Sequence, residues 1–164
     1  MTKDNNELVF VPLGGVGEIG MNLAMYGYGP ATNRKWIVMD VGVTFPGPHL
    51  PGVDLVLPDI RFLLAEKHNV EAIITTHAHE DHYGALLSLY PMIAPDGDVP
   101  VYMTPFGAGM LESKAVGERD APKIKVTSFD AGGSFQAGPF KIQALAVTHS
   151  IPEPVSIAIG TPLG

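Results

Sequence analysis

Four residues with side chains that commonly bind metal ions lie within six consecutive positions of the sequence: His77, His79, Asp81 and His82. In an extended chain, residues two apart project to the same side, so the rings of His77 and His79 can close on one ion. Zn²⁺ accepts imidazole nitrogens readily. One step along the turn, Asp81 and His82 can hold a second ion about 3.5–4 Å from the first. The spacing therefore predicts a site for two metal ions.

A purely structural role suits the isolated histidines better than it suits this cluster. His49 lies between two prolines and His68 near an expected helix end, and both are interpreted as ordinary polar residues. Three rings crowded on one turn repel one another when protonated and gain little from packing. The chain has no cysteine, so only His, Asp and Glu can serve as strong metal ligands.

The cluster lies where a strand is expected to turn into a helix. Residues 70–74 form an apolar run of strand length, and Leu86, Leu87 and Leu89 follow with helical spacing. Asp81 opens that helix, where negative charge is favoured. Pro91 is expected to end it, and Pro58 to lie in the first turn of another. The other elements expected are strands at 8–13, 21–27, 35–40, 99–103, 123–129, 133–136, 140–148 and 155–160, helices at 58–67 and 105–116, and a loop at 43–56.

The motif His77-x-His79-x-Asp81-His82 after an apolar strand resembles the metal signature of the metallo-β-lactamase superfamily. The segment 13–22, which reads LGGVGEIGMN, narrows the resemblance to the ribonuclease J family of β-CASP nucleases. Segments 39–42, 58–60, 75–82 and 147–152 support it. The strand and helix pattern suits a two-sheet α/β sandwich. The resemblance implies the αββα fold, with residues 1–164 as the amino-terminal part of one such domain.

Two further residues gain a role from the resemblance. His149 follows the apolar segment 144–148 and becomes the third histidine of the first metal. Asp40 ends the expected strand 35–40, where an Asx turn is the ordinary interpretation. The resemblance implies instead that Asp40 orients the ligand loop by hydrogen bonds. The implied metal ligands in the chain are His77, His79, Asp81, His82 and His149.

The resemblance implies a metal-dependent ribonuclease that hydrolyses RNA phosphodiester bonds. Expected activities are 5′-to-3′ exonuclease and some endonuclease cleavage, in messenger decay and ribosomal RNA processing, with Asp81 as ligand and proton handler. Three imidazoles favour Zn²⁺, and a second site with a carboxylate could equally suit Mn²⁺. A hydrolase of the same fold acting on an ester, thioester or lactam is the first alternative. Such enzymes are not expected to share the Gly14–Asn22 stretch.

The glycine stretch offers a second alternative, because Gly15, Gly17 and Gly20 spell a G-x-G-x-x-G dinucleotide fingerprint with Asp40 twenty residues further on. That fingerprint needs a helix after it, whereas residues 21–26 alternate like a strand and glycines follow. We therefore expect a hairpin turn with positive φ or a loop that borders the metal site.

Composition bounds the class of protein. The 164 residues, 46% of them hydrophobic, suffice for one core, and neither a signal segment at residues 1–7 nor a membrane span is expected, which favours a cytoplasmic protein. The formal charge of −7, from 17 acidic and 10 basic residues, argues mildly against nucleic acid. Two bound divalent ions would nevertheless make the charge at the metal site positive.

The chain lacks parts that the resemblance implies. A further aspartate that bridges the two ions, a β-CASP domain with its late histidine ligand and 5′-phosphate pocket, and a carboxy-terminal assembly domain are not among its residues. We therefore expect an amino-terminal fragment that binds metal weakly and turns over little or no RNA. The full-length protein is expected to be a homo-oligomer, and the fragment to self-associate through exposed sheet edges.

Overall fold

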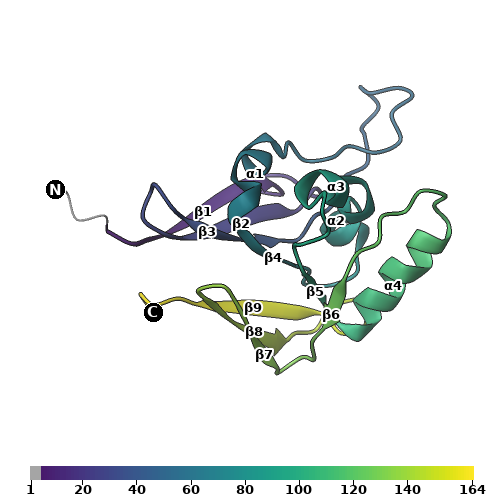
Figure 1. The fold of residues 1–164 in the computed structure, drawn as a ribbon. Helices are drawn as coiled ribbons and strands as arrows, with labels where there is room; N and C mark the ends of the chain where they lie inside the picture. The colour runs from purple at the N-terminus through teal and green to yellow at the C-terminus, as the bar shows by residue number, and fades with distance from the viewer. Residues whose placement is uncertain (1–4) are drawn as a thin grey trace.

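A computed structural model describes residues 5–164 (Figure 1). Residues 1–4, the start of the segment examined for a signal sequence, lie outside the described residues. The strands are β1 (Glu7–Gly14), β2 (Leu23–Gly29), β3 (Lys35–Met39), β4 (Val70–Ile74), β5 (Val101–Met103), β6 (Val126–Ser128), β7 (Ser134–Ala137), β8 (Phe140–Ala146) and β9 (Val155–Gly160). The helices are α1 (Arg61–Glu66), α2 (Glu80–Tyr83), α3 (Leu86–Ile93) and α4 (Pro105–Val116), with a 3-10 turn, η1 (Lys67–Asn69).

Two sheets form the framework. The first has the order β1-β2-β3-β4-β5-β6, antiparallel from β1 to β3 and parallel from β3 to β6. The second is antiparallel, with the order β7-β8-β9. Helices cover one face of the first sheet, and the second sheet covers the other (Figure 1). The α/β sandwich expected from the sequence is confirmed. Among the described residues, the helices lie on one side of the two sheets.

Each face of the first sheet has its own hydrophobic core, because strand residues alternate in direction. Val38 and Ile73 pack toward the helices together with Leu63 and Leu86. Ile37 and Ile74, their neighbours along the chain, pack toward the second sheet. β3 and β4 are therefore apolar on both faces, as expected for the central parallel strands of a covered sheet.

The glycine stretch forms the turn of a hairpin. β1 and β2 pair antiparallel, and Gly15, Gly17 and Gly20 have φ of 82°, 83° and 96° between them. Glycine adopts such angles without steric cost. Since a strand, not a helix, follows, the hairpin prediction is confirmed and a dinucleotide fold is not favoured.

The helices differ from the sequence prediction at several boundaries, and the helix expected to open at Asp81 is divided into α2 and α3. α1 begins at Arg61, not Pro58, because the carboxylate of Asp59 accepts a hydrogen bond from the Arg61 N–H and holds the chain before the helix. α3 continues past Pro91 to Ile93. A proline removes only one helical hydrogen bond, and burial of Tyr90 and Ile93 holds this last turn in place.

None of the helices in residues 5–164 combines the length and apolar character needed to cross a membrane.

Candidate metal centre

The ends of two neighbouring parallel strands create the site. β4 is buried at Ile73 and Ile74, and the chain leaves it through Thr75 and a short loop into α2. β3 lies beside β4, and the N–H of Asp40 donates to the carbonyl of Ile74 at 2.9 Å. Side chains that follow β3 and β4 therefore meet at the carboxyl edge of the sheet.

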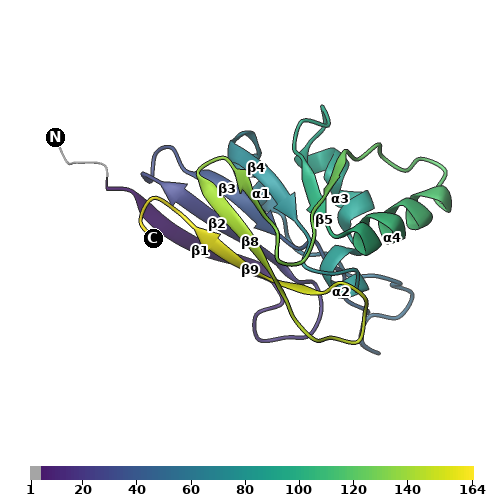
Figure 2. The ribbon, with the colours of Figure 1, turned by 90° about the horizontal axis from the view of Figure 1, so that it is seen from below.

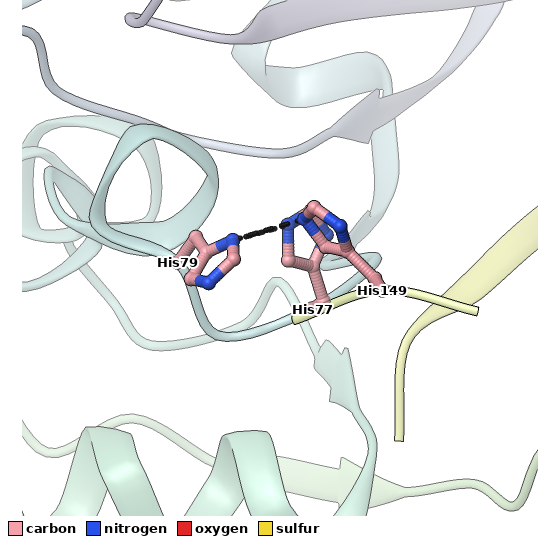
Figure 3. Close-up of side chains that lie close together, drawn as sticks. All are labelled: His77, His79 and His149. Carbon is pink, nitrogen blue, oxygen red and sulfur yellow. Dashed lines mark hydrogen bonds between the residues drawn. The ribbon is translucent and has the colours of Figure 1, made fainter. Parts of the chain in front are cut away.

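Three histidine rings converge at this edge (Figure 3). His77 Nε2 lies 3.1 Å from His79 Nδ1, and His149 Nε2 lies 3.1 Å from the same nitrogen. His77 and His79 follow β4 of the first sheet, whereas His149 lies in the loop between β8 and β9 of the second. The structure thus brings together residues separated by 70 positions.

The three nitrogens fit a single small cation. All lie within 4.8 Å of one another. Around a tetrahedral Zn²⁺, with Zn–N bonds of about 2.0–2.1 Å, ligand nitrogens would be about 3.3–3.4 Å apart. The two shorter separations are close to this value. His149 is exposed, which leaves an approach from solvent.

His77 is held as a neutral imidazole. Burial, followed by repulsion from His82, His79 and His149, lowers the pKa of its ring to about 4. Near pH 7 the ring therefore carries no proton on one of its nitrogens. A neutral ring with a free lone pair is the form that binds metals.

Asp40 joins the strand end to the ligand loop. It has a φ of 59° and is only 6% exposed. Its carboxylate accepts hydrogen bonds from the Thr76 N–H at 2.8 Å and from the Thr76 hydroxyl at 3.0 Å. The Thr76 oxygen lies 3.0 Å from His77 Nδ1. If His77 donates its Nδ1 proton there, Nε2 keeps its lone pair toward the cluster.

Asp40 also holds His82, whose Nδ1 lies 2.7 Å from the carboxylate. Burial by itself would lower the pKa of His82. The hydrogen bond and the negative charge of Asp40, together with Asp81, outweigh burial and raise it. Asp40 therefore contacts both halves of the motif, through Thr76 and through His82.

Asp81 and His82 form a second group, next to the three histidines. The Asp81 carboxylate lies 3.5 Å from His82 Nε2, and the ring centroids of His77 and His82 are 4.0 Å apart. All the metal-ligand candidates and Asp40 therefore gather in one region. Their roles as ligands remain a proposal.

Sequence reasoning missed Asn22. Its side-chain amide donates to the Asp81 carboxylate at 3.1 Å and lies 3.2 Å from His82 Nε2. Its position at the end of the glycine stretch was the available signal. The glycine loop also borders the site, because Ile19 and Gly20 line a hollow together with His79 and Asp81. The stretch thus forms a turn, as predicted, and also lies beside the candidate metal ligands.

Gly42 was missed as well. A Cβ atom added at this position would lie 1.7 Å from the Asp81 carbonyl oxygen. The neighbouring Val41 N–H donates to the His82 carbonyl at 2.8 Å, and the Asn22 N–H donates to the Asp81 carbonyl at 3.0 Å. Residues 41 and 42 therefore pack directly against the backbone of α2.

A cavity of about 520 Å³ opens beside the cluster, between the two sheets. Its polar wall includes Asp40, His77, His82 and His149. Its apolar wall comes from both sheets and includes Tyr26, Met39, Ile157 and Ile159.

A family model described as a beta-lactamase superfamily domain matches residues 35–164 of the chain. The chain belongs to the beta-lactamase superfamily. The fold of this superfamily implies a divalent metal, and the histidine cluster lies within the matched residues. One solved structure, the metallo-beta-lactamase fold protein YhfI from Bacillus subtilis, has a TM-score of 0.62 at 14% identity. The aligned region covers 95% of this chain and 58% of the YhfI chain. The structural similarity supports the superfamily fold.

Two curated relatives of this chain are named more specifically than the superfamily: both are called ribonuclease J. Ribonuclease J from Sinorhizobium meliloti is 58% identical over 164 residues, which is 100% of this chain and 28% of that protein. Ribonuclease J from Corynebacterium glutamicum is 36% identical over 159 residues, which is 97% of this chain and 21% of that protein. The chain therefore spans less than a third of the length of either relative.

Replacing Asp40 with Asn is expected to weaken zinc binding about tenfold, as changes to partners of metal ligands commonly do. Asn tolerates the positive φ, so the change removes charge without adding backbone strain. A competition titration with a chromophoric chelator measures the affinity. Asp59→Asn, an exposed aspartate paired with Arg61, serves as control and should bind zinc like the wild type. Equal affinities for all three proteins would contradict the role of Asp40.

Proposed function

We propose that the chain is the amino-terminal part of a metal-dependent ribonuclease and that His77, His79 and His149 hold one divalent ion. The observation that carries the proposal is the convergence of their three ring nitrogens within 4.8 Å, from two different sheets. The relatives named ribonuclease J support the substrate class.

Asp81 and His82 are proposed to hold a second ion. His82 presents Nε2 toward Asp81 while its Nδ1 is engaged by Asp40. The all-imidazole group favours Zn²⁺, and a group with a carboxylate also accepts Mn²⁺. A complete centre would thus hold Zn²⁺ at the three histidines and either Zn²⁺ or Mn²⁺ at Asp81 and His82.

A divalent metal bound there would supply a water acidic enough to react near neutral pH, and positive charge for phosphoryl oxygens. The protein residues fix the geometry. Asp40 holds the His82 ring and the Thr76 hydroxyl, and Thr76 in turn contacts His77. Asp81, whose side chain is about one-third exposed, is placed to accept or pass on a proton at its carboxylate.

RNA is the substrate class that the relatives support best. An ester, thioester or lactam hydrolase of the same fold would share the histidine cluster, but the 58% identical relative is a ribonuclease J. Exonuclease and endonuclease action, messenger decay, ribosomal RNA processing and a cytoplasmic location remain expectations for the whole protein. So do homo-oligomerisation of the whole protein and self-association of this chain through exposed sheet edges.

The test uses the full-length protein and a 5′-monophosphorylated RNA, with and without added Zn²⁺ or Mn²⁺. The wild type should release mononucleotides from the 5′ end in a metal-dependent manner. His77→Ala in the same protein should lower the rate by at least about 100-fold, since a metal ligand is lost. Hydrolysis of a lactam or thioester without RNA cleavage would contradict the proposal.

A further inference from the structure

Helix α4 contacts both segments that carry the clustered histidines. It follows β5 of the first sheet and lies beside α2 and α3 (Figure 2). Leu111 fixes it to the helical core. About 12 Å of helix separates Phe106 near its start from Lys114 in its last turn, at 1.5 Å per residue. Each of these two positions makes a polar contact with one half of the site.

The start of α4 holds the His149 loop. Glu153, four residues after His149, accepts a hydrogen bond from the Phe106 N–H at 2.7 Å. The first N–H groups of a helix have no partner within the helix, and a carboxylate is a favoured acceptor there. Glu153 has a φ of 54°, an angle that residues other than glycine rarely adopt. The loop between β8 and β9 is thus fixed to the first sheet through α4.

The end of α4 holds α2. Lys114 Nζ donates to Glu80 Oε2 at 2.6 Å and to the Gly84 carbonyl at 3.1 Å. It also lies over the Tyr83 ring, 5.2 Å from the centroid. Lys114 therefore contacts both ends of α2: Glu80 at its start, and Tyr83 and Gly84 at its end. Asp81 and His82 lie between these contacts.

We infer that Lys114 and Glu153 are positioning residues, which act through α4 to fix His149 against the segment that carries His77, His79, Asp81 and His82. This inference rests on the proposed metal centre. The need for it follows from the topology: His149 belongs to the second sheet, and the other candidates follow β4 of the first. A rigid link between the two sheets keeps the ring nitrogens at ligand spacing before any ion arrives.

The test compares Lys114→Met and Glu153→Ala with the wild-type chain, in zinc titrations against a chromophoric chelator. Each variant should bind zinc about three- to tenfold more weakly. The effect is modest because the contacts of Lys114 with Glu80 and of Glu153 with Phe106 are partly exposed and only orient the ligands. Lys114→Arg, which keeps the charge, and Glu153→Gln, which keeps an acceptor oxygen, should restore most of the affinity. Glu112→Gln removes an exposed charge from the same helix and should bind like the wild type.

Hydrogen exchange of the metal-free proteins gives a second readout that needs no metal. Glu153→Ala should speed exchange in residues 147–155, and Lys114→Met in residues 80–85, while residues 70–74 stay unchanged. Faster exchange together with weaker zinc binding supports the inference. Faster exchange with unchanged affinity in a zinc-binding wild type overturns it, because the contacts would then be merely structural.

Failure of the proposed metal centre would look different. If the wild-type chain binds no zinc through His77, the proposed function fails, and the inference that rests on it fails as well. If the wild type binds zinc through His77 but Lys114→Met and Glu153→Ala bind it equally well, the inference alone fails.

Discussion

Replacing His77 with Ala is expected to weaken zinc binding by at least about 100-fold, because loss of a ligand should exceed the 10- to 100-fold effect of losing a ligand's partner. His77 supplies the nitrogen that lies 3.1 Å from His79, and its ring is the one that burial keeps neutral. Competition with a chromophoric chelator at pH 7 measures the affinity. The thermal midpoint of the metal-free variant shows whether the fold persists.

His68→Ala is the matched control for this experiment. His68 lies in η1, before β4, whereas His77 follows the other end of the same strand. Five strand residues at about 3.3 Å each separate the two ends by roughly 16 Å. His68→Ala should therefore bind zinc like the wild type. Comparable affinities for His77→Ala and His68→Ala would show that the cluster is not the zinc site.

Gly42→Ala is expected to lower the free energy of unfolding by about 3 kcal/mol or more, at the upper end of what overpacking costs. The added Cβ would lie 1.7 Å from the Asp81 carbonyl oxygen. The backbone fixes the position of the Cβ, and the oxygen is itself a backbone atom, so neither can rotate away. The chain must move, and α2 moves with Asp81 and His82. For a chain of this size, the melting temperature should fall by about 6–12 °C. Differential scanning calorimetry measures both quantities.

Gly109→Ala provides the control for this substitution. Gly109 lies in α4, and a Cβ added there meets no atom within 4 Å. Alanine is a better helix former than glycine, so stability should stay equal or rise by up to about 1 kcal/mol. If Gly42→Ala unfolded at the same temperature as Gly109→Ala, the close approach between residues 42 and 81 would be refuted.

Local patterns in the sequence were sufficient to predict the sheets. The apolar run 70–74 and the helical spacing after it predicted β4 and a following helix, and the structure has both. Alternation after the glycine stretch predicted β2. Boundaries were harder, because they depend on tertiary contacts. Pro91 stays within α3 because Ile93 is buried, which the sequence alone does not reveal.

The candidate site was predictable where residues cluster in sequence. His77, His79, Asp81 and His82 stood out from their spacing, and His149 and Asp40 came from the resemblance. Asn22, Gly42 and the two α4 contacts were not predictable in this way. Asn22 lies 59 residues from Asp81, and Glu153 lies 47 residues from Phe106. Such partners are brought together only by the topology of the sheets.

Metal content after dialysis tests the central claim most directly. The wild-type chain, His77→Ala and His149→Ala would be dialysed to equilibrium against a buffer that contains a low, fixed concentration of free Zn²⁺, and their zinc content measured by elemental analysis. We expect roughly one equivalent of zinc in the wild type, for one three-imidazole site, and loss of that zinc in both variants. Equal zinc content in all three proteins, or none in the wild type, would contradict the claim that the three histidines hold a metal ion.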